Sequence, residues 1–251
     1  MPSAESDAVF ASRLAIEAGQ ILVDLREQLF SEGASQWDVK DAGDAAAQAY
    51  LAHELHTHRR DDAVLSEEEG KTDHRRFDAE RVWIIDPLDG TREFSEPGRD
   101  DWAVHVALWE GDGFGAAAVS LPALNAVFAT DPAPPIPEVD RDRPRLITSR
   151  TRAPYSAVLV AEGLDADAVR LGSAGAKAMA VVMGHADIYV HDGGMFQWDS
   201  AAPAAVAMAA GFHASRLDGS PLVYNERDPW LPDFILCRPE LAEPVLKAIW
   251  G

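Results

Sequence analysis

The stretch from Val82 to Phe94, VWIIDPLDGTREF, constrains this chain more than any other part of it. Four apolar residues of strand-forming types run directly into Asp86 and Asp89, two carboxylates three positions apart. This pattern predicts a buried strand whose carboxyl end presents the acids, which is where open α/β sheets place their ligands. Because Pro87 has no N–H to donate, we expect strand pairing to stop at that residue.

The residues after the second acid favour an anion-binding turn. Gly90 lets the backbone approach a ligand closely, and the amides of Gly90 and Thr91 can hold phosphate oxygens. Carboxylates beside a phosphate would repel it unless a cation lay between them. Oxygen ligands at such a turn suit Mg²⁺, which is commonly shared with substrate phosphates. An ordinary strand-to-turn junction needs only one acid, so we prefer a magnesium-dependent phosphate site.

The composition restricts the partners of the chain. Its 42 acidic and 22 basic residues give a net charge of −20, which argues against binding polymeric nucleic acid through a basic surface. An anionic substrate therefore needs divalent cations and a few well-placed bases close by. The N-terminus is polar and acidic, and no apolar run is long enough for a membrane span. The single cysteine, Cys237, fits a reducing cytoplasm.

Periodicity predicts two lobes of different character. In the first half, apolar residues recur at helical spacing over residues 7–30 and 45–58. Strands are predicted over residues 62–66, 103–108, 114–121 and 125–130, and the last three of these are expected to be successive and antiparallel. Five prolines in residues 131–144 mark a boundary, which divides the chain into an α+β lobe, 1–140, and an α/β lobe, 141–251. The second lobe alternates strands, at 145–149, 169–171, 188–190 and 234–236, with helices, at 155–164, 176–183, 201–210 and 239–250.

The segment WIIDPLDGTREF resembles the D-P-(I/L)-D-G-T signature of the inositol monophosphatase-like, lithium-sensitive, Mg²⁺-dependent phosphatases. Phosphatases of the haloacid dehalogenase type instead place two acids two positions apart and form a covalent aspartyl intermediate. The spacing here is three, which disfavours that chemistry. The resemblance covers nearly the whole chain. It implies a layered α-β-α-β-α sandwich of the inositol monophosphatase and fructose-1,6-bisphosphatase type, often a homodimer.

The resemblance also implies a ligand set for two or three Mg²⁺ ions. Leu65-Ser66-Glu67-Glu68 is similar to the family's L-S-E-E form, which makes Glu67 a ligand. Asp86, Asp89 and the carbonyl of Leu88 would come from the signature itself. Asp199 would join them from Trp198-Asp199-Ser200-Ala201-Ala202, which resembles a second-lobe W-D-x-A-A motif. Judged from the residues alone, Asp199 is an ordinary helix N-cap.

The remaining site residues are also carried over from the family. A Thr-x-x-Asp on an early helix places its acid beside the threonine of the signature, which gives a Thr91–Asp44 pair that orients or deprotonates the attacking water. This chain has Asp41 where the motif threonine is expected. We assign Asp44, and not Asp41, as the partner of Thr91, because the number of residues between Asp44 and Glu67 is close to the family's interval. Substrate contacts are expected at Gly90, Thr91 and Arg92, at Ser173 and Lys177 of GSAGAK, and at Asp192, although a glycine-rich loop and a Gly-Gly turn would explain the last two segments.

The combination of D-G-T-R-E-F, G-S-A-G-A-K and W-D-S-A-A-P looks most like actinobacterial members of the CysQ-type branch. That branch hydrolyses 3′-phosphoadenosine 5′-phosphate to AMP. A second phosphate needs a second base, and Arg92 and Lys177 are candidates. The alternatives within the class are inositol monophosphate and fructose 1,6-bisphosphate. An alternative from another class is a catalytically silent regulator that binds Mg²⁺ or a nucleotide.

Overall fold

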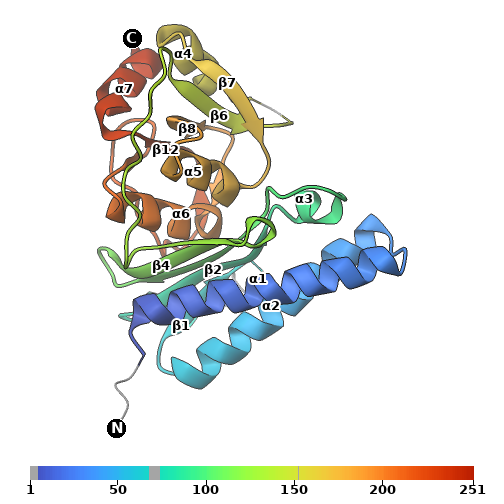
Figure 1. The fold of residues 1–251 in the computed structure, drawn as a ribbon. Helices are drawn as coiled ribbons and strands as arrows, with labels where there is room; N and C mark the ends of the chain where they lie inside the picture. Colours follow the sequence, from blue (N-terminus) through green and yellow to red (C-terminus); the bar gives the residue numbers. More distant parts are fainter. Residues whose placement is uncertain (1–4, 68–73, 152) are drawn as a thin grey trace.

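The computed structural model describes residues 5–67, 74–151 and 153–251. Two long helices, α1 (Asp7–Ser31) and α2 (Gln36–His58), lie against one face of the first sheet (Figure 1). The helix predicted over residues 45–58 begins nine residues earlier, because the Ser35 side chain caps it by accepting a hydrogen bond from the Asp38 amide. This extension places Asp44 inside the helix, one turn before Gln48.

The first sheet holds five strands in the order β1-β2-β3-β4-β5. The strands β3, β4 and β5 are successive and antiparallel, as the sequence predicted, whereas β1 pairs in parallel with β2. A short helix, α3 (Thr91–Ser95), follows β2 directly. The bounds are β1 (Ala63–Ser66), β2 (Val82–Asp89), β3 (Ala103–Trp109), β4 (Phe114–Leu121) and β5 (Ala126–Ala129), with 3₁₀ turns η1 (His74–Phe77) and η2 (Pro122–Leu124).

The second sheet is mixed, in the order β10-β12-β8-β6-β7. Its strand β6 is parallel to both neighbours, while β12 runs antiparallel to β8 and to β10. Its strands are β6 (Arg145–Ser149), β7 (Asp167–Leu171), β8 (Ile188–His191), β10 (His213–Ser215) and β12 (Phe234–Cys237). The helices of this half are α4 (Tyr155–Gly163), α5 (Ala174–Val182), α6 (Gln197–Ala209) and α7 (Ala242–Trp250), the last preceded by η3 (Pro239–Leu241).

Three clusters of buried residues define five layers (Figure 1). One cluster joins α1 and α2 to the first sheet, and another joins α4 and α7 to the second sheet. The central cluster contains side chains of both sheets and of α5 and α6, which lie between them. The order is therefore α-β-α-β-α, as the family resemblance implied. The boundary predicted at residue 140 falls in the connection between β5 and β6, and a division into separate domains stays a prediction.

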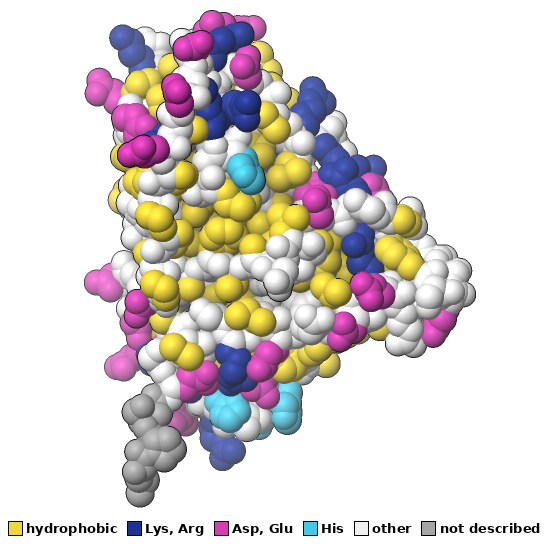
Figure 2. Space-filling model, in the orientation of Figure 1, with side chains coloured by type: hydrophobic (Ala, Val, Ile, Leu, Met, Phe, Trp, Pro, Cys, Tyr) yellow, Lys and Arg dark blue, Asp and Glu magenta, His cyan; other side chains and the backbone are white. Residues whose placement is uncertain are grey.

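Charged and apolar side chains separate on the face seen in Figure 2. Apolar side chains gather across its middle, and most charged side chains lie toward its edges (Figure 2). Cys237 is buried in β12. Within the described ranges, no helix combines the length and the apolar character that crossing a membrane requires.

Candidate metal and phosphate site

An irregularity in β2 brings the two signature acids to one side of the sheet. Asp86 pairs with His105 and Asp89 with Ala103, so three steps along β2 match two along β3. Side chains of a regular strand alternate between faces, so residues three apart would point in opposite directions. The extra residue forms a β-bulge, so the Asp86 and Asp89 side chains lie on the same face of the sheet. The expectation that pairing would stop at Pro87 is wrong, because the bulge passes the proline and pairing resumes at Asp89.

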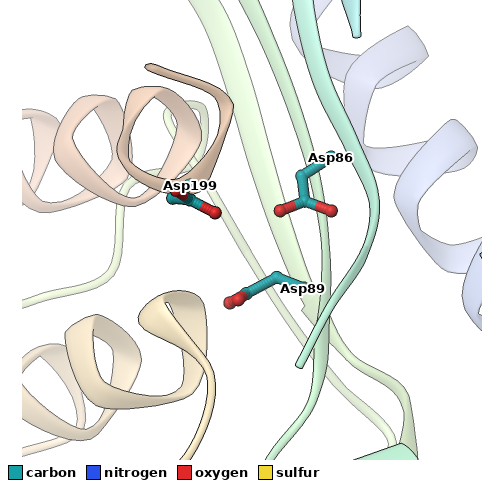
Figure 3. Close-up of side chains that lie close together, drawn as sticks. All are labelled: Asp86, Asp89 and Asp199. Atoms are coloured by element: carbon teal, nitrogen blue, oxygen red, sulfur yellow. The ribbon is translucent and has the colours of Figure 1, made fainter. Parts of the chain in front are cut away.

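A third carboxylate reaches the same point from helix α6, in the second half of the chain. Asp199 lies in the first turn of α6, and its Oδ2 accepts a hydrogen bond from the Phe196 amide at 2.6 Å. It is therefore the third helical residue and not the N-cap, because α6 begins four residues before the predicted Ala201. Oxygens of Asp86, Asp89 and Asp199 all lie within 4.8 Å of one another (Figure 3).

The three acids are held in place by different contacts. Asp86 is 1 % exposed and accepts a hydrogen bond from the Leu88 amide at 3.1 Å. Asp89 accepts from the Ser173 hydroxyl, from the Ala174 amide at 3.1 Å and from the Gly175 amide at 2.6 Å. Those three donors lie at the start of α5, so a carboxylate at the end of β2 caps a helix from the second half of the chain.

Burial and mutual repulsion raise the pKa values of two of the three acids, Asp86 and Asp199. Burial first, and then the charges of Asp89, Asp199 and Glu67, raise the pKa of Asp86 well above its usual value. The pKa of Asp199 is raised to about 8, mainly by burial and by Asp89. A cation held between these carboxylates would favour their charged forms and so lower both pKa values again.

Glu67 follows β1, and its side chain is exposed. It lies outside the group of three whose oxygens are within 4.8 Å, but its charge contributes to the raised pKa values of both Asp86 and Asp199. Its neighbours Glu68 and Glu69 fall outside the described residues. The assignment of Glu67 as a ligand stays a prediction.

The turn after β2 brings together Thr91, Leu88 and Asp44. The Thr91 hydroxyl lies 3.3 Å from Asp44 Oδ1 and 3.1 Å from the Leu88 carbonyl, and it can donate its single proton to one of them at a time. Asp41 is exposed one turn earlier on α2. Gly90 has a φ of 87°, a conformation that strains other residues, and a Cβ there would lie 3.0 Å from the Ser173 Cβ and 3.2 Å from the Asp101 carbonyl, so glycine is favoured at this turn.

A cavity of about 390 Å³ opens beside Asp89 and Asp199. Among its lining residues, all of them described, Lys177 is the one lysine or arginine. The Lys177 ammonium donates to the Ser173 carbonyl at 2.6 Å, and burial lowers its pKa. A larger hollow of about 860 Å³ lies between α4 and α7, but none of the three clustered acids lines it, so volume alone does not mark the site.

The other predicted substrate contacts have different positions. Ser173 lines the cavity, whereas Arg92 does not: it is largely exposed, and its Nε lies 3.2 Å from Glu96. Asp192 lines an adjoining cavity of about 590 Å³ that shares Ser149 and His191 with the first. The Asp192 carboxylate accepts from the Ser156 amide at 2.8 Å.

Sequence reasoning did not single out several residues around the site. Tyr189, His191 and Trp230 line the cavity, and His105 lies buried behind the acids. A lone histidine between valines in an apolar strand was a signal for His105. Trp230 had no such signal, because it comes from the two-residue strand β11 (Trp230–Leu231), which pairs with β9 (Met195–Phe196).

Comparison with known proteins identifies the family. The sequence profile of the inositol monophosphatase family matches residues 3–132 and 138–251. The chain belongs to the inositol monophosphatase family. A relative from Mycobacterium bovis, named 3′-phosphoadenosine 5′-phosphate phosphatase, is 49 % identical over 241 residues, which cover 93 % of this chain and 89 % of the relative.

Two further members extend the comparison. The 3′(2′),5′-bisphosphate nucleotidase CysQ of Escherichia coli K12 is 30 % identical over 200 residues, covering 76 % of this chain and 81 % of that protein. The crystal structure of inositol monophosphatase II from Staphylococcus aureus superimposes with a TM-score of 0.79 at 20 % identity, covering 96 % of this chain and 91 % of that one. The latter likeness shows that the fold is the family's fold.

Proposed function

We propose that this protein is a Mg²⁺-dependent phosphomonoesterase that converts 3′-phosphoadenosine 5′-phosphate to AMP and inorganic phosphate. The observation that carries the proposal is the convergence of Asp86, Asp89 and Asp199, two of which, Asp89 and Asp199, line a cavity together with Lys177. The names of the relatives at 49 % and 30 % identity supply the substrate class.

The donor set fits magnesium. The three acids offer carboxylate oxygens, the ligands that Mg²⁺ prefers, and two of them have raised pKa values that a cation would reverse. Asp86, Asp89 and Asp199 would hold the ion, with Glu67 and the Leu88 carbonyl as additional ligands for a second or third. When bound, Mg²⁺ neutralises phosphate charge and lowers the pKa of a coordinated water.

The chain's own groups would then position the reactants. When the Thr91 hydroxyl donates its hydrogen bond to Asp44, a lone pair of Thr91 Oγ1 is available to orient the attacking water. The amides of Gly90 and Thr91 hold phosphate oxygens as charge develops on them. Water adds to phosphorus as the bond to the 3′ oxygen breaks, and the leaving oxygen takes a proton. No covalent intermediate on the protein is required.

Lys177 is the group best placed to contact a second phosphate. It lies in the wall of the cavity, whereas Arg92 lies outside and is paired with Glu96. Asp192, with Ser149 and His191, borders the adjoining cavity and would contact the rest of the nucleotide. Inositol monophosphate and fructose 1,6-bisphosphate remain the alternative substrates.

The experiment that tests the proposal is a comparison of kcat/KM for 3′-phosphoadenosine 5′-phosphate, inositol 1-phosphate and fructose 1,6-bisphosphate at saturating Mg²⁺. We expect the nucleotide to be preferred by at least about tenfold, which corresponds to roughly 1.4 kcal/mol of transition-state binding. A preference for inositol 1-phosphate would replace the nucleotidase proposal. Absence of phosphate release from all three would favour the silent regulator.

Three expectations from the sequence analysis remain predictions. They are a homodimer, a cytoplasmic location and a count of two or three Mg²⁺ ions. Light scattering at several protein concentrations tests the first, fractionation of the source cells tests the second, and calorimetric titration with Mg²⁺ tests the third.

A further inference from the structure

His105 is a buried histidine in β3, beside the clustered acids. It stands directly opposite Asp86 in the strand register, so the two side chains lie on the same face of the sheet. Its side chain is 0 % exposed. Its neighbours Val104 and Val106 belong to the cluster under α1 and α2, so His105 points the other way, toward α5 and α6.

One ring nitrogen of His105 holds the start of α6. Nδ1 lies 3.1 Å from the Trp198 carbonyl oxygen. A carbonyl can only accept a hydrogen bond, so Nδ1 carries the proton and donates it. Trp198 immediately precedes Asp199, whose carboxylate is tied back to the Phe196 amide. The bond from β3 therefore fixes the helical turn that presents Asp199.

The other edge of the ring contacts the remaining two elements of the site. Nε2 lies 3.4 Å from Asp89 Oδ2 and has no hydrogen-bond partner in the described part of the chain. Gly175, at the start of α5, packs against the same edge: a Cβ at this position would lie 2.1 Å from Nε2. The ring thus touches β2, α5 and α6 together, and glycine at 175 is what leaves room for it.

We propose that His105 is a positioning residue that sets the separation of Asp89 and Asp199, so that carboxylates from different lobes face one cation. The proposal rests on the proposed function, in which these acids hold Mg²⁺. A histidine that only filled the core would contact apolar neighbours or satisfy both nitrogens locally. This one donates to the residue beside one acid and lies against the other, with one nitrogen left unbonded.

Three substitutions separate positioning from packing. His105→Asn keeps an N–H close to the place of Nδ1 and can still donate to the Trp198 carbonyl. His105→Gln carries its amide further along the side chain, near the place of Nε2, and loses that bond. His105→Ala loses both. Groups that orient metal ligands typically change metal affinity by about 10- to 100-fold when removed.

The measurement is Mn²⁺ binding, followed by electron paramagnetic resonance or calorimetry, with thermal unfolding in EDTA recorded for each variant. We expect His105→Asn to bind Mn²⁺ within about threefold of the wild-type protein, and His105→Gln and His105→Ala to bind at least about tenfold more weakly. Equal affinity in all three variants, with lowered unfolding temperature only, would show that His105 merely packs. Equal losses for Asn and Gln would also overturn the proposal, and that comparison remains available if His105→Ala does not fold.

A further control separates this inference from the proposed function. Asp86→Asn in the wild-type background must weaken Mn²⁺ binding if the acidic cluster is the metal site. If wild-type protein and Asp86→Asn bind Mn²⁺ equally, the proposed function fails. If Asp86→Asn weakens binding and the His105 variants do not, only the role of His105 fails.

Discussion

Asp89 Oδ2 accepts a hydrogen bond from the Gly175 amide at 2.6 Å, so an acid on strand β2 of the first sheet caps helix α5. The Ser173 hydroxyl and the Ala174 amide donate to the same carboxylate. Asp89 therefore has a structural role between β2 and α5 in addition to its place among the clustered acids. Asp86 accepts one short-range hydrogen bond, from the Leu88 amide, and among the described residues it accepts none from α5 or α6.

This difference predicts opposite effects of two similar substitutions on the metal-free protein. Asp89→Asn loses acceptor capacity for three donors at the start of α5 and should lower the free energy of unfolding by about 2 kcal/mol. In the folded protein the buried Asp86 carboxyl must either keep a proton or bear the repulsion of Asp89, Asp199 and Glu67, so Asp86→Asn should raise the free energy of unfolding by about 1 kcal/mol. Both should abolish Mg²⁺-dependent turnover. Thermal unfolding in EDTA measures the contrast, and equal shifts of the same sign would contradict it.

The raised pKa values predict an inverse relation between metal-free stability and metal affinity. Between the usual value of 3.8 and about 8, the folded protein keeps a proton on Asp199 that the unfolded chain has released. Metal-free stability should therefore fall as pH rises through this window and level off above it. Mg²⁺ must displace that proton, so its affinity should rise over the same range.

Calorimetry at pH 7 in buffers of different ionisation enthalpy measures the protons released on Mg²⁺ binding. We expect at least about half a proton per ion, since a group with a pKa near 8 is mostly protonated at that pH. Binding enthalpies that are independent of the buffer would contradict this picture. Asp199→Asn should release fewer protons for each ion that it still binds, because it removes one of the two carboxyl groups with raised pKa values.

Thr91 and Asp44 should act as one unit. Their side chains lie 3.3 Å apart, and the hydroxyl needs the carboxylate as acceptor to be oriented toward a water. Thr91→Ala and Asp44→Ala should each lower kcat by about 100-fold, and the double variant should lose little more. The exposed Asp41→Ala is the matched control and should keep wild-type kcat. Multiplicative losses in the double variant would show that the two residues act separately.

Selectivity should depend on Lys177 more than on Arg92. A charge-assisted contact to a second phosphate is worth roughly 1.5–3 kcal/mol, so Lys177→Met should lower kcat/KM for 3′-phosphoadenosine 5′-phosphate by about 10- to 100-fold. Inositol 1-phosphate, which lacks the second phosphate, should be affected much less. Arg92→Ala should change kcat/KM for both substrates little, because the Arg92 side chain is paired with the surface acid Glu96. Equal losses on both substrates for Lys177→Met would show that it does not contact the second phosphate.

Much of the architecture could be predicted from the sequence, because the spacing of apolar residues and the positions of glycine and proline agree with the observed elements. The helical spacing of residues 7–30, the antiparallel strands after residue 103 and the clustered prolines before residue 145 each correspond to an element or connection of the structure. Helix starts were harder to predict. Residues 36–44 hold two large apolar side chains, Trp37 and Val39, which do not make an apolar stripe, so α2 was expected to begin at Ala45 although the Ser35 cap starts it at Gln36.

The site could be predicted only as far as motifs specify it. The signature acids and Asp199 were named from their motifs, but their convergence depends on a bulge that no local pattern indicates. The role of His105 depends on strand register, which pairs it with Asp86. The contacts of Asp89 with α5 depend on how the lobes pack. Such relationships are tertiary contacts, and the types and spacing of residues along the chain do not predict them.

The measurement that tests the central claim most directly is phosphate release from 3′-phosphoadenosine 5′-phosphate as a function of Mg²⁺ concentration, for the wild-type protein and for Asp199→Asn. Asp199 is the acid that the second lobe contributes, so its loss tests whether the site spans both lobes. The wild-type protein should release phosphate only when Mg²⁺ is present, and Asp199→Asn should lose at least about 100-fold in kcat/KM, roughly 2.7 kcal/mol. Phosphate release that persists in EDTA, or near-native activity of Asp199→Asn at saturating Mg²⁺, would contradict the account.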